Sequence, residues 1–398
     1  WAGTYATELL ALMGAEVIQL EVRNRLDSWR GSYQNPIPKS LTDVPTAEHP
    51  WNCSPLYNSV NLNKQCITVD LAQPEGFEIF NGLVTHADFV AENFSPRVMG
   101  NLGIDYETLT QINPNLVMAS LSAYGAKGPW ANVPGIGGTI EPSSGMSSLL
   151  GYEGEHPQNS GQMYPDPVAG LCGFGAIATA LLHRDRTGRG QYIDLSMQEA
   201  NFTFIGDAWL EYEVLGNVRG PMGNRHLGFA PHGMYRVRGD DQWIAIAVET
   251  DEQWVACYEV LGIDGARWPD AESRVAAQSD IDEIVAAAVV GADKVDIALR
   301  LSKAGVQSAP VLDSVEVVDD EVLRARGHMV CVEHPEVGPM WQSGVPVHFR
   351  RTPGGVTAPA PLQGQHSFEV FQRFLGLDRA EYDELVMKGV SGKGEFKP

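Results

Sequence analysis

Alternating helical and strand-like segments in the first third of the chain constrain the fold more than any other sequence feature. Apolar residues recur with helical spacing in some segments and form short runs typical of strands in the segments between them. Such alternation favours a parallel or mostly parallel sheet with helices on its faces, in which ligands lie beyond the carboxyl ends of the strands. The predicted helices are 4–13, 75–86 and 106–112, and the predicted strands are 16–21, 67–71, 88–92 and 116–121.

The pattern changes after Met197, and 398 residues are enough for two substantial cores. An aromatic-rich helix is predicted over 201–215, and a glycine-rich loop follows it. The next segment combines a hairpin, a strand over 243–248 and helices over 253–261, 281–289 and 294–304, which is typical of an α+β unit. We therefore predict a large Rossmann-like α/β domain with a mostly parallel sheet (1–200), a linker (201–232) and a smaller α+β domain (233–325). The last segment (326–398) is predicted to be a return linker followed by C-terminal helices over 365–375 and 379–387, which pack on the large domain.

Composition narrows the class of protein. A formal net charge of -22 and a pI of about 4.8 argue against nucleic acid or an anionic membrane as the main partner. Five scattered cysteines without a CxxC pair suit a reducing cytoplasm and give no zinc site. The sequence shows no secretory signal, and we expect that a segment precedes Trp1 in the natural protein.

A lone carboxylate, Asp166, stands at the mouth of an apolar, glycine-containing helix predicted over 168–186. An aspartate followed by a proline is typical of a helix start, so Asp166 is expected to be the N-cap. Because the helix is apolar nearly all round, we expect it to be buried, and its length and glycine content argue against a membrane span. A helix N-terminus also favours an ionised carboxylate, and carboxylates can form covalent acyl intermediates. Local sequence leaves both roles open for Asp166, a plain cap or a nucleophile.

Two further features of the sequence each need an interpretation, segment 24–63 and a pair of histidines. The polar segment 24–63 is rich in proline and aromatic residues, and it is expected to form either a functional loop or a surface decoration. Its aromatic residues, with Trp209 and Tyr212 of the aromatic helix, suggest a bulky or aromatic substrate. His226 and His232 flank a glycine loop without metal-ligand spacing, so they are interpreted as loop or interface residues. The sequence contains no GxSxG, HExxH, Walker A or EF-hand motif.

Several separated blocks resemble the family III CoA-transferases, the group that contains formyl-CoA transferase, carnitine CoA-transferase and α-methylacyl-CoA racemase. They occur in order along nearly the whole chain, and together they are highly specific. The main blocks are AGTYATELLALMGAEVIQLE, NLNKQCITVDLAQPEG, ADFVAENFSP, LGIDYETLTQINPNLVMASLSAYGAKGP, LLHRDRTGRGQYIDLSMQEA, PHGMYRVRGDDQWIAIAV, AGVQSAPVLDSVEVVDDEVLRARG and APLQGQHSFEVFQRFLGL.

The resemblance implies that Asp166 is the catalytic nucleophile. In this family the carboxylate attacks an acyl-CoA thioester to give a mixed anhydride, and CoA thiolate then converts the anhydride to an aspartyl-CoA thioester. The acceptor acid attacks that thioester, and returning CoA completes the exchange. Amides of the nearby glycine segment, at Gly137 and Gly138, are expected to stabilise the developing oxyanions. CoA is expected as a substrate, with no permanently bound cofactor and no metal.

The resemblance also implies positions for CoA binding. Asn93 and Phe94 match the family's ENF signature, and Trp1 falls where its CoA contacts near the nucleophile begin. Other residues match the adenine and ribose pocket or offer a compensating phosphate contact; these are Val69, Val98, Leu102 and Arg97. For the three apolar residues plain core packing is an equal alternative. Many relatives carry basic residues where this chain has Ala72 and Ser95, which leaves the phosphate contacts open.

Two other activities stay open at this point. The racemases of the group use a histidine in a Gly-His-Asp context that aligns with Gly135, Ile136 and Gly137, and isoleucine cannot act as an acid or base. A CoA-binding subunit of a heteromeric transferase is the other alternative. The family implies an interlocked dimer, expected here as a homodimer or as a heterodimer with a paralogue, and the donor acyl-CoA and acceptor acid are beyond the sequence.

Overall fold

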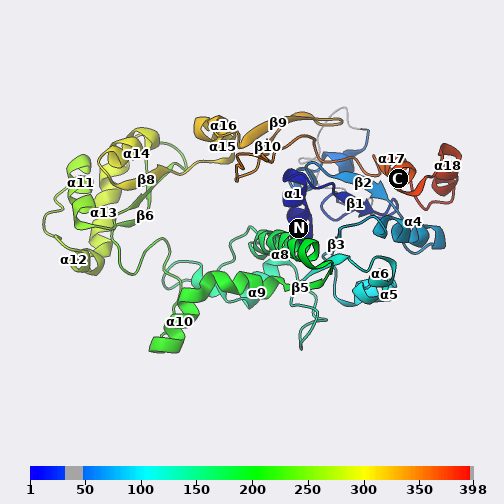
Figure 1. Cartoon of the computed structure of the whole chain (residues 1–398). Helices are drawn as coiled ribbons and strands as arrows, with labels where there is room; N and C mark the ends of the chain where they lie inside the picture. Colours follow the sequence, from blue (N-terminus) through cyan, green and yellow to red (C-terminus); the bar gives the residue numbers. More distant parts are fainter. Residues whose placement is uncertain (32–47, 395–398) are drawn as a thin grey trace. The chain divides into compact units, whose positions relative to one another are not determined.

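A computed structural model describes residues 1–31 and 48–394, and these residues divide into two compact units (Figure 1). The larger unit comprises Trp1–Met146, Asn159–Trp209 and the chain from Glu321 onward. The smaller unit comprises Ser147–Gln158 and Leu210–Asp320. The domain boundaries expected from the sequence stay a prediction.

Parallel sheets form the centre of the larger unit, which confirms the mixed α/β class with parallel strands. β3 (Phe89–Glu92), β4 (Val117–Ser122) and β5 (Tyr192–Ser196) pair in the order β3-β4-β5. β1 (Ile18–Glu21) and β2 (Gln65–Thr68) form a second parallel pair. Every residue of β4 is buried, as expected for a central parallel strand covered on both faces.

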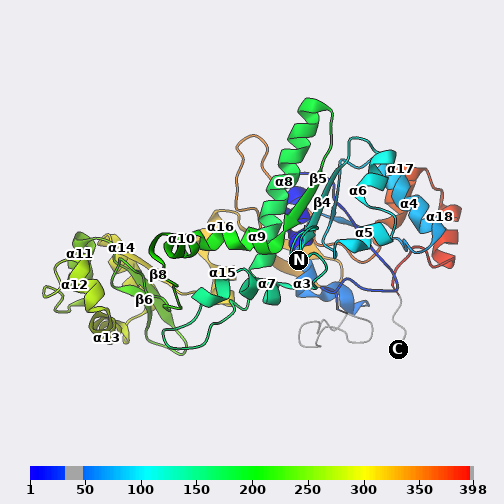
Figure 2. The same cartoon turned by 90° about the horizontal axis from the view of Figure 1, so that it is seen from below.

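Two helices pack closely against each other and share a core with the central sheet. α1 (Ala2–Leu12) lies beside α8 (Pro165–Thr187), and Figure 2 shows α8 running alongside β4 and β5. Glycine permits the close approach, because a Cβ at Gly170 would lie 2.9 Å from Tyr5 Cδ1 and one at Gly173 would lie 2.8 Å from Leu121 Cδ2. The shared core contains Ala2, Ala6, Leu10, Ala119, Leu121, Ile140, Ala169, Ile177 and Met197.

The expectation that α8 is buried all round is wrong for this chain. One face packs on α1 and β4, whereas Leu171 and Leu182 on the other face are each 51% exposed. The expectation that the helix is too short for a membrane is also wrong, because α8 alone among the described helices is long and apolar enough to cross one. A core helix of a soluble protein meets the same test, and α8 has the buried face of such a helix.

The remaining helices of the larger unit cover the edges of the sheets. α4 (Pro74–Val84), α17 (Ser367–Leu375) and α18 (Arg379–Met387) share a core with β2. α6 (Tyr106–Ile112) has the predicted bounds. Shorter elements are η1 (Pro50–Cys53), α3 (Pro55–Asn58), α5 (Arg97–Asn101), α7 (Gly137–Ser143), α9 (Met197–Phe202), η3 (Thr203–Ile205) and α16 (Glu321–Ala325). Two further elements, η2 (Met146–Leu149) and α10 (Gly206–Leu215), contain residues of both units. The single helix predicted over 201–215 is therefore interrupted.

The smaller unit has an antiparallel sheet in the order β6-β7-β8. Its strands are β6 (His232–Arg236), β7 (Trp243–Ala247) and β8 (Gln307–Pro310), and its helices are α11 (Asp251–Leu261), α12 (Ala271–Ala276), α13 (Gln278–Val289), α14 (Lys294–Lys303) and α15 (Ser314–Asp319). β8 was not expected from the sequence. In the larger unit, β9 (Met329–His334) and β10 (Gly338–Ser343) form a hairpin at the start of the segment interpreted as proline- and glycine-rich linker.

A buried polar network anchors both described ends of segment 24–63, whose residues 32–47 lie outside the described chain. Arg30 is 1% exposed, and its guanidinium donates to both carboxylate oxygens of Glu21 at 2.9 to 3.1 Å. The same guanidinium donates to Asn52 and to the Pro361 carbonyl, and it stacks 3.4 Å from the centre of the Tyr57 ring. The network therefore ties the described ends of the segment to β1 and to the C-terminal part of the chain.

We expect Arg30→Met to lower the free energy of unfolding of the larger unit by about 3 kcal/mol, because it leaves the Glu21 carboxylate buried without its partner. Urea denaturation followed by circular dichroism measures the change. Arg186→Met, at an exposed position in the last turn of α8, is the matched control, with an expected change below about 0.5 kcal/mol. Equal effects of the two substitutions would contradict a stabilising role for the network.

Candidate active site

Asp166 lies inside the first turn of α8. The residue before the helix is Tyr164, and it makes no side-chain capping bond, so the expectation that Asp166 is the N-cap is wrong. The Asp166 N–H donates to the Met163 carbonyl at 2.9 Å, and Met163 has a left-handed φ of 47°. The carboxylate therefore sits at the positive end of the helix dipole without being used to cap it.

Backbone from two other helices meets the Asp166 carboxylate. The backbone nitrogen of Trp1, immediately before α1, lies 3.8 Å from Asp166 Oδ1. Gly137 is the first residue of α7, and a Cβ built there would lie 2.2 Å from Asp166 Oδ2 and 2.5 Å from Met163 Cβ. The starts of α1, α7 and α8 thus converge on one carboxylate, and only glycine fits at 137.

The two carboxylate oxygens have different surroundings. Asp166 is 7% exposed, and Oδ2 is buried without a hydrogen-bond partner in the described chain. Burial raises the pKa of Asp166 above its usual value, although the Ala2 N–H that donates to the carboxylate opposes this. The ionised, nucleophilic form is therefore lost as the pH falls through this raised pKa. A desolvated carboxylate with a free oxygen is suited to attack on an electrophile.

A second carboxylate, Glu141, holds the loop before Asp166 and was missed by sequence reasoning. Glu141 is fully buried in α7, and it accepts from the Ser160 N–H and hydroxyl, each at 2.6 Å. Asn159 donates to the Gly138 carbonyl at 3.0 Å. The first turn of α7 and the loop that leads into α8 are thereby tied together. Local sequence offers no signal for these contacts, because the partners are 19 to 21 residues apart.

Asn93 lies beside the start of α1, at the carboxyl end of β3. Its Oδ1 accepts from the Gly3 N–H at 3.1 Å, and its Nδ2 donates to the Leu121 carbonyl. Phe94 follows with its side chain 52% exposed, and its N–H donates to Glu92 at 2.6 Å. Asn93 thus joins α1 to the end of β4, and Phe94 presents an aromatic surface beside this junction.

The other residues that match the family's CoA pocket lie in different environments. Val69 is fully buried among Ile67, Ile79 and Phe371, so its side chain offers no surface to a ligand and acts in core packing. Leu102 is half-buried and packs on a neighbouring apolar cluster, Val98 is half-buried in α5, and Arg97 is exposed at the start of α5. Gly138, the second expected oxyanion residue, faces open space next to Gly137.

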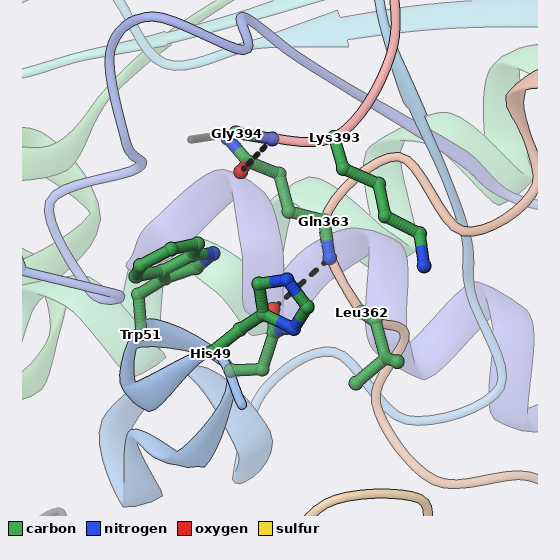
Figure 3. A pocket seen from close by; sticks show the side chains of 7 residues that line it. His49, Trp51, Leu362, Gln363, Lys393 and Gly394 are labelled. Atoms are coloured by element: carbon green, nitrogen blue, oxygen red, sulfur yellow. Dashed lines mark hydrogen bonds between the residues drawn. The ribbon is translucent and has the colours of Figure 1, made fainter. Parts of the chain in front are cut away.

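A small cavity lies apart from these residues (Figure 3). Its volume is about 10 Å3, enough for one water molecule. The lining includes His49, Trp51, Gln363 and Lys393, and the Gln363 N–H donates to Asn52. None of the predicted site residues lines the cavity. Residues 1–31 and 48–394 contain no cluster of His, Cys, Asp or Glu able to hold a metal ion.

Comparison with known proteins agrees with this geometry. The family model described as CoA-transferase family III matches residues 1–367. The succinyl-CoA–L-malate CoA-transferase alpha subunit of Chloroflexus aurantiacus is 30% identical over 389 residues, which cover 96% of this chain and 88% of that protein. The beta subunit from the same organism is 29% identical, over 83% of this chain and 84% of that protein. A crystal structure of a CAIB/BAIF family protein from Brucella suis superposes with a TM-score of 0.82 at 27% identity, over 94% of this chain and 95% of that one.

These matches extend over nearly the whole chain and include both parallel sheets, the segment of Asp166 and the smaller unit. The two curated relatives are named as CoA-transferases. The chain therefore belongs to CoA-transferase family III and is an acyl-CoA:carboxylate CoA-transferase.

Proposed function

We propose that Asp166 carries CoA between two acids through covalent intermediates. The observation that supports this most is the buried, unpartnered Oδ2 of Asp166 at the meeting point of three helix starts. The carboxylate attacks the thioester carbonyl of the donor, the C–S bond breaks, and an aspartyl anhydride and CoA thiolate result. The thiolate attacks the aspartyl carbonyl, and the donor acid leaves with the bridging oxygen.

The second half repeats these steps in reverse. The acceptor carboxylate attacks the aspartyl-CoA thioester and releases CoA thiolate. The thiolate then attacks the acceptor carbonyl of the new anhydride, which regenerates Asp166. Each tetrahedral intermediate carries an oxyanion, and the backbone N–H groups at the start of α1 and α7 are the proposed donors that stabilise it. Gly137 brings the backbone of α7 against the carboxylate, as such a role requires.

We propose that CoA binds beside this carboxylate, at the carboxyl ends of the parallel strands. Asn93 and Phe94 follow β3, and Arg97 with Val98 and Leu102 lies on α5 directly after them. Arg97 is exposed and is the cation nearest in sequence to the Asn93 junction, which suits a phosphate contact. Trp1 borders the nucleophile itself. The names of the relatives specify succinyl-CoA and L-malate for those proteins, and we propose for this chain only a donor acyl-CoA and an acceptor acid.

Racemisation is the weaker alternative. A racemase needs a second acid or base beside the aspartate, and Ile136 occupies the position that matches the racemase histidine. The neighbours described around the Asp166 carboxylate are backbone of Trp1, Ala2 and Gly137 and the side chain of Met163. Within the described chain this set offers no imidazole, so transfer is favoured.

We further propose that the working enzyme is a cytoplasmic dimer. The outer face of α8 exposes Leu171 and Leu182, and α10 has no buried residue although it carries five large apolar side chains. These are Trp209, Leu210, Tyr212, Val214 and Leu215, between 39% and 76% exposed. Apolar surface of this extent is typical of an interface. The named alpha and beta subunits among the relatives keep a heterodimer with a paralogue as the alternative to a homodimer. All five cysteines are free, as in a reducing compartment.

Asp166→Asn removes the nucleophile with little change in shape, so we expect kcat for CoA transfer to fall by about a thousandfold or more. Transfer is measured by mass spectrometry with a panel of acyl-CoA donors and acids. Asp185→Asn, on the exposed end of the same helix, is the control and keeps its activity. A fully active Asp166→Asn variant would refute the mechanism, and exchange of the α-proton for deuterium without an acceptor acid would indicate a racemase instead.

Gly137→Ala places a methyl group where Asp166 Oδ2 and Met163 already lie, and the carboxylate must move. Because a displacement of about 1 Å at a reacting group costs about 100-fold, we expect a loss of that size in kcat/KM. Gly291→Ala, between α13 and α14 with open space around its Cβ, is the matched control and retains activity. Unchanged kinetics in Gly137→Ala would show that the close approach is unnecessary for catalysis.

We expect sedimentation velocity to give twice the chain mass for the purified protein. The double variant Val214→Asp and Leu215→Asp places charges on the exposed apolar end of α10 and should yield monomer. A wild-type protein that sediments as a monomer and is active alone would contradict the proposed dimer. Activity that appears only after a second, different chain is added would select the heterodimer.

A further inference from the structure

Two indole rings lie together beside the nucleophile. Trp1 immediately precedes α1, and its backbone nitrogen lies 3.8 Å from Asp166 Oδ1. Its ring packs against that of Trp29, with ring centres 5.3 Å apart and planes inclined by 59°. Trp29 is half-buried, and the Trp1 side chain is 23% exposed. The pair therefore forms one apolar surface, carried by the residue whose backbone nitrogen lies beside Asp166.

The position of Trp29 is fixed from three directions. Its N–H donates to Asp27 Oδ1 at 2.8 Å, and its carbonyl accepts from the Ser54 hydroxyl. The next residue, Arg30, is locked in the buried network with Glu21. These contacts fix the main chain at Trp29, and the Trp1 ring packs against its side chain. A side chain on a fixed main chain loses less conformational freedom when a ligand binds, which favours a role in recognition.

The Trp1 ring also carries an unused polar group. Its Nε1 is buried and has no hydrogen-bond partner in the described chain. An indole N–H can only donate, and buried ones usually find an acceptor. A ligand that complements this pair needs a flat apolar body to lie on the rings and an acceptor atom for the N–H.

The other aromatic side chains of segment 24–63 are used differently. Tyr57 is fully buried under Arg30, and Trp51 is 8% exposed beside His49. Among the described aromatic residues of segment 24–63, Trp29 alone is thus left for contact with a substrate. Within this segment, the expectation of a bulky or aromatic substrate therefore depends on the pair formed by Trp29 and Trp1.

We propose that Trp1 and Trp29 form a specificity wall that selects acyl groups with an aryl body and a hydrogen-bond acceptor. This inference rests on the proposed function, in which the acyl carbon is bonded to Asp166 during turnover. An aryl group attached to that carbon by a short linker stacks on the wall, whereas a small aliphatic acyl group leaves the wall uncovered. The wall therefore acts on the choice of acid and not on the chemical step.

The test compares phenylacetyl-CoA, 4-hydroxyphenylacetyl-CoA and acetyl-CoA as donors in wild type, Trp29→Ala and Trp29→Phe. We expect Trp29→Ala to lower kcat/KM for the two aryl donors by about tenfold or more, and that for acetyl-CoA by less than about threefold. Trp29→Phe restores most of the aryl preference because it keeps an aromatic face. Trp1→Phe removes the N–H together with part of the aromatic surface. The loss of surface affects both aryl donors, so the loss of the N–H should appear as a lower preference for the hydroxylated donor over phenylacetyl-CoA. Trp341→Ala, an exposed tryptophan on β10, is the control.

Binding measurements distinguish a failure of this inference from a failure of the proposed mechanism. In Asp166→Asn, which cannot form the covalent intermediate, isothermal titration should show tighter binding of phenylacetyl-CoA than of acetyl-CoA, and Trp29→Ala should abolish the difference. Equal losses for aryl and acetyl donors in Trp29→Ala, with equal binding of both, would overturn the wall while transfer still occurs. Absence of transfer with every donor, together with preserved aryl-selective binding, would overturn the mechanism and leave the wall standing.

Discussion

The burial of one carboxylate among three helix starts is the constraint on which the site depends. Asp166 lies in the first turn of α8, with backbone of α1 and α7 on either side, so both of its oxygens are surrounded by main chain. This arrangement is possible only because α1 and α8 touch through Gly170 and Gly173, and because Gly137 has no side chain. The packing of the core and the placement of the Asp166 carboxylate therefore depend on the same feature, small residues at three positions.

Electrostatics explain why a protein keeps such a carboxylate. Desolvation makes the ionised form costly and raises the pKa of Asp166, and the helix starts offset only part of that cost. In the proposed mechanism, the same amides favour the negative charge that develops when the carboxylate attacks a thioester. The free energy that offsets this cost has to come from other interactions of the larger unit. These are the Arg30–Glu21 network and the core that α1, α8 and β4 share. An orphaned oxygen is thus a local instability that a rigid surrounding structure tolerates.

Sequence periodicity predicted the parallel architecture and most of the helices, because the spacing of apolar residues reports directly which face is buried. α6 and α18 have the predicted bounds, and Asp166 was singled out by its place at the start of an apolar helix. The exposed face of α8 could not be recognised, since apolar residues on an exposed face give the same sequence pattern as apolar residues in a core. The β9–β10 hairpin was missed because glycine and proline interrupt its sequence, whereas β8 was missed because its four residues, QSAP, show no apolar strand pattern. Glu141, Ser160 and the Trp1–Trp29 pair depend on contacts between segments distant in sequence, for which local pattern carries no signal.

The most direct test of covalent catalysis by Asp166 follows the oxygen atoms of the acceptor acid. If Asp166 forms the anhydrides, one oxygen of a heavy-oxygen-labelled acceptor acid must remain in the Asp166 carboxylate after each turnover, and the donor acid released in the next turnover must carry it away. Mass spectrometry of the Asp166 peptide and of the released acid measures both. We predict label in the side chain of Asp166 and then in the released acid. Efficient CoA transfer with no label in either would contradict it.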